Sequence, residues 1–323
     1  MAHVFHRGGP VSGEVEARSM RERLTLLAKV TWLVAILGLT VWYLSANWTE
    51  IVRYAERLHF AQLVGATSAV ILSRVLLAGI SRLALEMNGS SITWRLSFWI
   101  NAVSQLGKYI PGSVWHFVGR LALYKRHGLS VAGGSGVLVV ENAALLLSGA
   151  SVGLISLVDV LRRADHLPGG MGVVVAAVVA AAAAWWAMVR WLPRLVGRWF
   201  ISFGHLRRAM LYWLCLGLWA SFGVAFWLLL PVDNMTVETL LLATGTFALA
   251  WIVGNLAPFA PAGIGVREAV IVALLAPELG VTMAVGVAAA SRVVWTIAEL
   301  GVAPVAGVIL ARTNNAADTR SAS

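Results

Sequence analysis

The sequence predicts an all-α polytopic membrane protein with about six transmembrane helices and two re-entrant broken-helix hairpins arranged as an inverted repeat. Three observations support this fold class. Hydrophobic residues make up 59% of the 323 residues and charged residues only 12%, against about 25% in soluble domains. Apolar runs of about 20 residues, the length that crosses a bilayer, recur along the chain. Two further apolar regions are interrupted by glycine and proline, and lipid tolerates broken backbone only where protein or a watery cavity satisfies it.

These runs give the elements in order. A polar arm at residues 1–24 is expected to be cytoplasmic, and a single membrane domain is expected over residues 25–312. The transmembrane helices are expected near residues 25–46, 60–81, 131–158, 170–189, 208–230 and 280–310. The polar tail at residues 313–323 is expected to be cytoplasmic and disordered.

The two interrupted regions are residues 94–124 and 238–277, and each is long enough to enter the membrane, turn and return on the same side. The residues that break the backbone are Pro111, Gly112, Pro258, Pro261, Gly263 and Gly265. Paired interruptions in corresponding halves of a chain mark a transport site, so we expect both breaks to face one cavity. If region 238–277 instead crosses the membrane twice, the chain has about eight spans.

The basic residues that give the chain its net charge of +10 are expected to lie mostly on one side of the membrane. With the N-terminus inside and neither hairpin crossing, most arginines fall in cytoplasmic segments, whereas the outer loops hold only Arg53, Arg57, Arg162 and Arg163. An excess of Lys and Arg is typical of cytoplasmic loops. Both termini are therefore expected in the cytoplasm, with the first hairpin opening from the cytoplasm and the second from the outside. Nucleic acid is not an expected partner.

Three motifs, in order along the chain, resemble those of one family. The first is Gly107-Lys108-Tyr109-Ile110-Pro111-Gly112-Ser113-Val114-Trp115. The second is Pro258-Phe259-Ala260-Pro261-Ala262-Gly263-Ile264-Gly265-Val266-Arg267-Glu268. The third is Ser291-Arg292-Val293-Val294-Trp295-Thr296-Ile297-Ala298-Glu299. They are similar to the signatures of the lysylphosphatidylglycerol synthase transmembrane, or flippase-like, family, except that Ala262 stands where the family usually has glycine.

The resemblance covers roughly residues 25–310 and implies two re-entrant hairpins and a role in moving polar-headed lipids between leaflets. Some relatives carry a soluble aminoacyl-transferase domain after the membrane part. The residues after the last expected span are too few for one, so the resemblance does not imply synthase activity. Other relatives are linked to polyprenyl-phosphate sugars or glycolipids, and the family alone does not select the cargo.

Charged side chains at membrane depth are costly unless paired or hydrated, so they are candidate substrate-binding residues. These candidates are Arg74, Lys108, Arg120, Glu141, Arg267, Glu268, Arg292 and Glu299. Arg267 is the foremost anion ligand, because a guanidinium binds phosphate in a bidentate way and the preceding glycines predict a helix N-terminus there. The alternative is a local structural pair between Arg267 and Glu268.

The other candidates have structural alternatives too. Arg292 and Glu299 lie two turns apart on one helix face, and each is expected to meet a partner from another helix, such as Glu141 and Arg74 respectively. The alternative is a buried ion network that fixes helix packing. Lys108 and Arg120 either contact a phosphate headgroup or extend to the interface. Four polar residues near the breaks either satisfy backbone groups or touch the cargo, namely Asn101, Gln105, Asn142 and Asn255.

Signatures of enzymes are absent from the sequence: it has no Walker motif, dinucleotide fingerprint, His-Glu-x-x-His or paired acidic metal cluster. The single cysteine, Cys215, excludes an internal disulfide and cysteine-based metal sites. We therefore expect no catalytic residues, no metal and no cofactor.

The expected function is flippase-like transport of an anionic phospholipid or a polyprenyl-phosphate-linked glycolipid between leaflets of the cytoplasmic membrane. One alternative is a non-catalytic membrane scaffold for a separate glycosyl- or aminoacyl-transferase. A less favoured one is an intramembrane transferase with Glu141 as its acid. A scaffold predicts that Arg267 and Arg292 tolerate alanine, whereas a flippase predicts that they do not.

Overall fold

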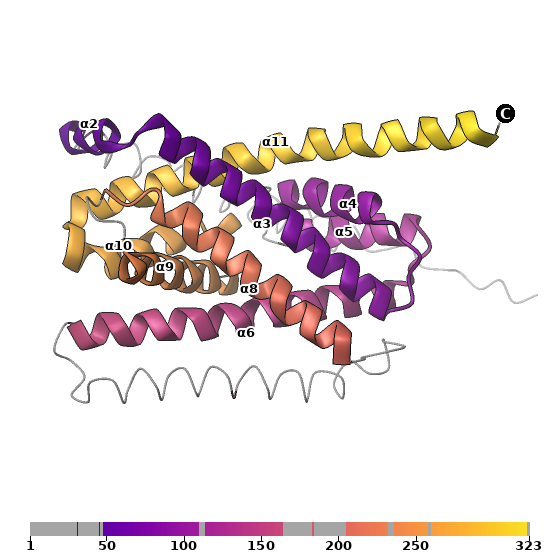
Figure 1. The fold of residues 1–323 in the computed structure, drawn as a ribbon, viewed down its shortest axis with the longest axis horizontal. Coiled ribbons are helices and arrows are strands. Elements are labelled where there is room, and N and C mark those ends of the chain that lie inside the picture. Colours follow the sequence, from indigo (N-terminus) through magenta and orange to yellow (C-terminus); the bar gives the residue numbers. More distant parts are fainter. Residues whose placement is uncertain are drawn as a thin grey trace, which may run out of the picture. The chain divides into compact units, whose positions relative to one another are not determined.

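The computed structural model describes residues 48–109, 114–163, 205–231, 236–257 and 260–321, together with the isolated positions Thr31, Ser45 and Ala183. Every regular element in these ranges is a helix (Figure 1), which confirms the predicted all-α class. Apart from those three positions, the spans expected at 25–46 and 170–189 lie outside the described residues. The chain from Thr49 onward forms one compact unit.

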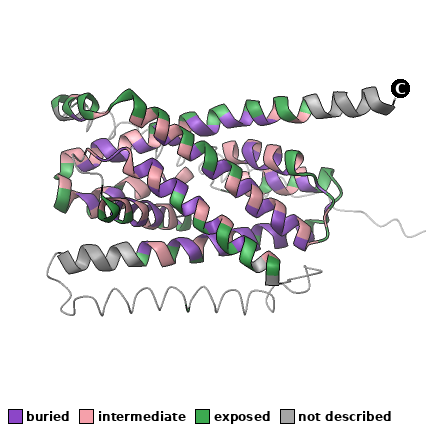
Figure 2. Cartoon of the chain, viewed as in Figure 1, coloured by how far each residue is buried: buried purple, intermediate pink, exposed green. Residues whose placement is uncertain are grey.

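Five helices of the described part are long and apolar enough to cross a membrane: α3 (Phe60–Met87), α6 (Val131–Arg163), α8 (His205–Trp227), α9 (Val237–Leu256) and α11 (Val281–Ser321). Four of them confirm expected spans, and α9 is an addition. Only 39% to 50% of the residues in their apolar windows are buried inside the protein. The same helices therefore expose apolar side chains, which suits lipid rather than water (Figure 2).

The short helix α2 (Trp48–Arg57) precedes the first of these spans. Its Tyr54 is 3% exposed, and the hydroxyl donates a hydrogen bond of 2.9 Å to the backbone carbonyl of Leu229, just after α8. Burial raises the pKa of the Tyr54 hydroxyl above its ordinary value. One side chain thus fastens residues 49–57 to the end of α8.

The first hairpin consists of α4 (Trp94–Leu106), the 3-10 turn η1 (Gly107–Tyr109) and α5 (Trp115–Arg126). The Thr93 side chain caps α4 by accepting the amide hydrogen of Leu96. With 13 and 12 residues, the two arms are about 20 Å and 18 Å long, too short for a hydrocarbon core of about 30 Å. These lengths agree with a re-entrant hairpin. Pro111 and Gly112 lie outside the described residues.

The second hairpin consists of α9, the turn η3 (Pro261–Gly263) and α10 (Val266–Leu279). At 14 residues, α10 is about 21 Å long and cannot cross the core. In contrast, α9 has 20 residues and is long enough to cross, because no proline interrupts it before Pro258. The second hairpin is therefore asymmetric, which differs from the expected pair of short arms. Pro258 lies outside the described residues.

The two hairpins approach from opposite ends of the bundle. In Figure 1, α4 and α5 lie at one end, and α9 and α10 lie toward the other. Their turns meet between the spans, where η1 contacts η3. Such opposed entry is what an inverted repeat predicts.

The last helix is longer than expected. α11 continues through Ser321, whereas a disordered tail was expected from residue 313. Residues 308–321 contain neither glycine nor proline, so nothing in the sequence ends the helix after its apolar part.

Candidate functional site

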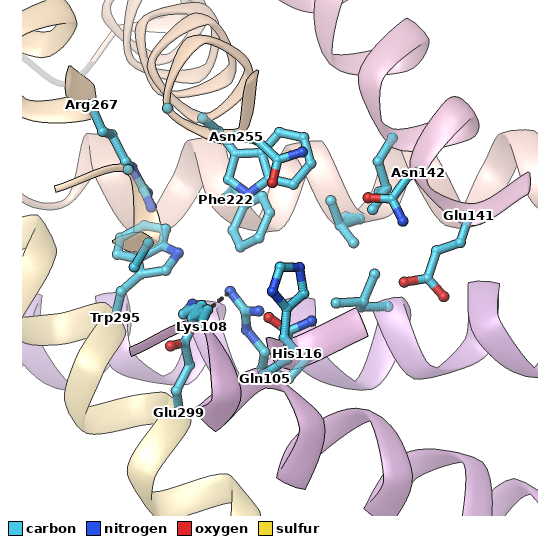
Figure 3. Close-up of a pocket in the computed structure, with 18 of the residues that line it drawn as sticks. Gln105, Lys108, His116, Glu141, Asn142, Phe222, Asn255, Arg267, Trp295 and Glu299 are labelled. Atoms are coloured by element: carbon cyan, nitrogen blue, oxygen red, sulfur yellow. Dashed lines mark hydrogen bonds and ion pairs between the residues drawn. The ribbon is translucent and has the colours of Figure 1, made fainter. Parts of the chain in front are cut away.

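A cavity of about 130 Å³ lies where the two helix breaks meet. Gln105, Lys108 and His116 line it from the first hairpin, and Asn255, Gly263 and Arg267 line it from the second. Figure 3 shows Arg267, Trp295 and Lys108 toward one side of the cavity and Glu141 and Asn142 toward the other. The predicted convergence of both breaks on one cavity is therefore confirmed.

The charged side chains that line the cavity do not balance. Among the described lining residues, four are cationic and two are anionic, a formal net charge of +2 with His116 neutral: Arg74, Lys108, Arg120 and Arg267 against Glu141 and Glu299. Charge at membrane depth is costly unless it is paired or hydrated. The excess therefore makes the cavity a favourable environment for an anion.

Glu299 of α11 is shared by two cations. Its Oε1 atom lies 2.5 Å from Nζ of Lys108 in η1 and 3.2 Å from Nη2 of Arg74 in α3. The Glu299 side chain is 1% exposed, so the lining cations rather than water neutralise it. The expected pairing of Glu299 with Arg74 is confirmed. One carboxylate cannot cancel two cations, and this cluster keeps one positive charge.

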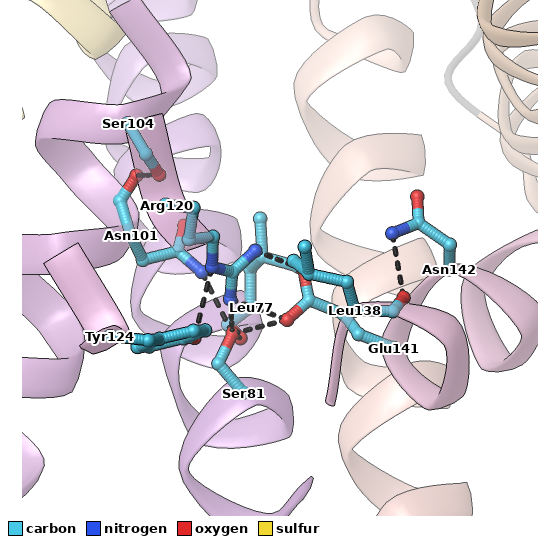
Figure 4. A network of polar contacts seen from close by, with 9 residues as sticks. All are labelled: Leu77, Ser81, Asn101, Ser104, Arg120, Tyr124, Leu138, Glu141 and Asn142. Atoms are coloured by element: carbon cyan, nitrogen blue, oxygen red, sulfur yellow. Dashed lines mark hydrogen bonds and ion pairs between the residues drawn. The ribbon is translucent and has the colours of Figure 1, made fainter. Parts of the chain in front are cut away.

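Arg120 and Glu141 form a separate buried network (Figure 4). Nη1 and Nη2 of Arg120 donate to Oε1 and Oε2 of Glu141 over 2.6 Å and 2.5 Å. Ser81 donates to Glu141 over 2.6 Å and accepts from Arg120 and from Asn101. Nε of Arg120 completes the set by donating to the Tyr124 hydroxyl over 3.0 Å. The network joins α3, α4, α5 and α6 and satisfies both charges internally.

Arg267 lies in the first turn of α10, as its position after the glycines predicts. Gly263 and Gly265 have φ angles of +68° and +83°, a conformation that glycine adopts without strain. The guanidinium carbon of Arg267 lies 4.2 Å from the centre of the Phe247 ring and 5.6 Å from that of Trp295. No carboxylate of the described residues forms an ion pair with it. The aromatic rings hold the cation in place without cancelling its charge.

Glu268 and Arg292 act on the turn rather than in the cavity. Nε of Arg292 donates to Oε1 of Glu268 over 2.7 Å, and its Nη1 donates to the carbonyl of Ala262 over 3.1 Å. Oε2 of Glu268 accepts the Gly265 amide over 2.7 Å. Neither side chain lines the cavity. Together they fasten η3 and the start of α10 to α11.

One predicted pairing and one alternative pairing are wrong. Arg292 does not meet Glu141, because Arg120 and Ser81 occupy both oxygens of that carboxylate. Glu268 does not pair with the adjacent Arg267, because it pairs with Arg292 instead. Glu268 of α10 and Arg292 of α11 pair with each other instead. Spacing along the sequence does not determine how these two helices are rotated relative to each other.

An aromatic wall is the part of the site that sequence reasoning missed. Trp219 and Phe222 of α8, Trp251 of α9 and Trp295 of α11 all line the cavity. The Phe247 ring packs against Trp295 at an interplanar angle of 31°, with ring centres 4.3 Å apart. Tryptophan in a membrane protein usually indicates an interfacial anchor, so its frequency alone gave no signal. Trp295 precedes Glu299 by four residues, which places the two side chains on one helix face. This spacing is the sequence feature that could have identified Trp295 as a lining residue.

The comparison with known families agrees with this arrangement. The family model described as lysylphosphatidylglycerol synthase TM region matches residues 29–307. That range contains all eight charged candidate residues and both helix breaks. No curated protein matches the chain.

Proposed function

The chain belongs to the family of lysylphosphatidylglycerol synthase TM regions, and on that premise we propose that it moves an anionic lipid between the two leaflets of the membrane. The headgroup passes through the cavity between the hairpins while the acyl or prenyl chains stay in lipid. The cargo class is a phospholipid or a polyprenyl-phosphate-linked lipid. The membrane is the cytoplasmic membrane, with both termini in the cytoplasm.

The uncancelled charge of Arg267 carries this proposal. Its guanidinium lies beside the cavity and against two aromatic rings, without a carboxylate partner in the described part of the chain. A planar guanidinium offers paired N–H donors that match phosphate oxygens. An anion that enters the cavity gains this charge-assisted contact and relieves the cost of the unpaired cation.

The size of the cavity suits a headgroup rather than a whole lipid. Its volume of about 130 Å³ is below the roughly 300–1,000 Å³ of pockets that enclose drug-sized ligands. The hairpins enter from opposite ends of the bundle (Figure 1), and both contribute residues that line this cavity. Movement of one hairpin at a time would open the cavity to one leaflet at a time, as alternating access requires.

The proposal includes no covalent step. An intramembrane transferase would need a general acid free to donate a proton to its substrate. Glu141, the candidate for that role, accepts hydrogen bonds from Arg120 and Ser81 at both oxygens. This saturation favours binding and transport over catalysis. A scaffold for a separate glycosyltransferase would not require an uncancelled cation in a cavity.

The test is lipid transport by Arg267 variants in proteoliposomes, measured as the accessibility of a labelled headgroup. Arg267→Ala should lower the transport rate by about 10-fold or more, the loss expected for a hydrogen bond to a charged group. Arg267→Lys should lower it less, because lysine keeps the charge but lacks the planar fork. Arg82→Ala is the matched control, since Arg82 pairs with Glu86 away from the cavity.

Insertion and melting temperature should be close to wild type in all three variants. If Arg267→Ala transports at the wild-type rate while it is normally inserted, the transport proposal fails. The scaffold function would then be the better account.

A further inference from the structure

We infer that the group bound in the cavity is a phosphate with two negative charges, a phosphomonoester or a diphosphate, rather than a singly charged phosphodiester. This inference rests on the proposed function and names its substrate class. Two independent observations carry it: the charge balance of the cavity and an indole N–H group that has no acceptor among the residues that the structure describes.

The charge balance gives the charge of the ligand. Glu141 cancels Arg120 completely within its own network. Glu299 cancels one of the two cations that share it, Arg74 or Lys108. Two positive charges therefore remain among the described lining residues, one on Arg267 and one on the cluster around Glu299.

A ligand with two negative charges makes the filled cavity neutral, which is the least costly state at membrane depth. A phosphomonoester carries about −1.5 to −2 at pH 7 and presents three strong acceptor oxygens. A diphosphate that joins two substituents carries one charge on each phosphorus. A phosphodiester carries a single charge and leaves one of the two cations uncancelled.

Trp295 provides the independent observation. It is 3% exposed, it lines the cavity, and its Nε1–H has no hydrogen-bond acceptor among the described residues. In Figure 3 the Trp295 ring lies between Arg267 and Lys108. An indole N–H can only donate, and a buried donor normally has a partner. An acceptor from a ligand belongs at this position.

The indole of buried Trp219 and that of partly buried Trp227 each have an acceptor. Nε1 of Trp219 donates to Ser148 over 2.8 Å, and Nε1 of Trp227 donates to Thr239 over 2.9 Å. Trp295 differs from both, and its ring centre lies 5.6 Å from the Arg267 guanidinium carbon. The cation and the neutral donor are close enough to bind different oxygens of one phosphate. Trp295 is accordingly a specificity-determining residue of the site.

The experiment compares two lipids with identical oleoyl chains, phosphatidic acid and phosphatidylglycerol, binding to the full chain in neutral nanodiscs. At pH 8 the monoester is close to doubly ionised, since its second pKa is about 6. Phosphatidic acid should bind about 10-fold or more tightly than phosphatidylglycerol. Trp295→Phe keeps the ring under Arg267 but removes the N–H, and it should weaken phosphatidic acid binding by about 10-fold. Trp227→Phe removes an indole N–H outside the cavity and should leave the affinity at the wild-type value.

The outcomes separate this inference from the function on which it rests. Equal affinity for the two lipids overturns the dianion inference and leaves the transport proposal intact. Wild-type affinity in Trp295→Phe, in a protein with normal melting temperature, removes the donor role. Failure to bind phosphatidic acid, phosphatidylglycerol and a polyprenyl monophosphate alike overturns both proposals. A second set of measurements with a polyprenyl monophosphate shows which hydrophobic tail the site accepts. Tight binding of either phosphatidic acid or the polyprenyl monophosphate supports the inference.

Discussion

The charged side chains at membrane depth differ in whether the protein itself cancels their charge. The charges of Arg120 and Glu141, whose side chains are 4% and 3% exposed, cancel each other. The charges of Arg74, Lys108 and Glu299 cancel in part. Arg267 lies against aromatic rings and forms no ion pair within the described part of the chain. Packing explains the first group, because an unpaired buried charge is strongly destabilising. The other two groups gain from an anionic ligand.

This division predicts different results of substitution. Arg120→Met should lower the free energy of unfolding by roughly 3–5 kcal/mol, because it leaves the Glu141 carboxylate buried without its partner. The double variant Arg120→Met with Glu141→Leu should recover much of that loss, since it removes both charges together. Thermal unfolding in detergent measures these differences.

Arg82→Ala serves as the control for this prediction. Arg82 pairs with Glu86 at side-chain exposures of 25% and 39%, and a pair of this kind contributes about 1 kcal/mol or less. If the double variant is as unstable as Arg120→Met, the network does not act as a structural ion pair. Arg120 would then return to the set of candidate cargo ligands.

At the scale of the elements, the turn of the second hairpin depends on backbone conformation. Three of its residues have positive φ: Ala262 at 53°, Gly263 at 68° and Gly265 at 83°. A Cβ atom on Gly263 would lie 3.0 Å from the Cα atom of Gly254 in α9. Glycine at 263 therefore serves both the left-handed conformation and the close contact between η3 and α9. Ala262 adopts the same conformation with a Cβ atom.

Neighbouring positions should consequently respond in opposite ways. Gly263→Ala should lower the free energy of unfolding by about 1–2 kcal/mol for the left-handed conformation alone, with a further loss from the contact with Gly254. Ala262→Gly relieves a comparable strain and should leave the melting temperature unchanged or raise it. The measurement is the melting temperature of both variants under one detergent condition. A drop in Ala262→Gly as large as that in Gly263→Ala would refute this account of the turn.

Elements and site residues were predictable from the sequence to different degrees. Apolar runs located four described spans, and the glycines and prolines located both breaks. The full length of α9 was missed because the charge pattern fits either arrangement. The extension of α11 was missed because no residue type marks its end. All eight charged candidates were identified from their expected depth in the membrane. Predicting which of them pair would require knowing how the helices are rotated relative to one another. Whether the Trp295 N–H has an acceptor depends on side-chain packing, which the sequence does not indicate.

At the scale of the whole molecule, helix ends and charges together suggest an orientation. Figure 1 places the end of α3, the α4–α5 pair and the start of α6 at one end of the bundle, and α2, the end of α8 and the start of α11 at the other. The first end carries Arg82, Arg95, Lys125 and Arg126. The second carries Arg53 and Arg57 together with Glu50 and Glu56. Because basic residues are in excess at cytoplasmic ends, we propose that the first end faces the cytoplasm.

Cysteine labelling tests this orientation. Cys215 is 1% exposed and is replaced by alanine to give a cysteine-free background. An impermeant thiol reagent added to intact cells should label Glu278→Cys, near the start of α11. It should label His127→Cys, between α5 and α6, only after permeabilisation. The reverse pattern would invert the orientation of the whole bundle.

The central claim is that the cavity between the two helix breaks binds an anionic lipid through Arg267. Native mass spectrometry of the lipids that remain bound to the purified protein tests it most directly. Wild type and Arg82→Ala should retain a phosphate-bearing lipid, and Arg267→Ala should lose most of it at equal protein recovery. If Arg267→Ala retains the same lipids in the same amounts as wild type, the cavity is not the lipid-binding site that its charge suggests.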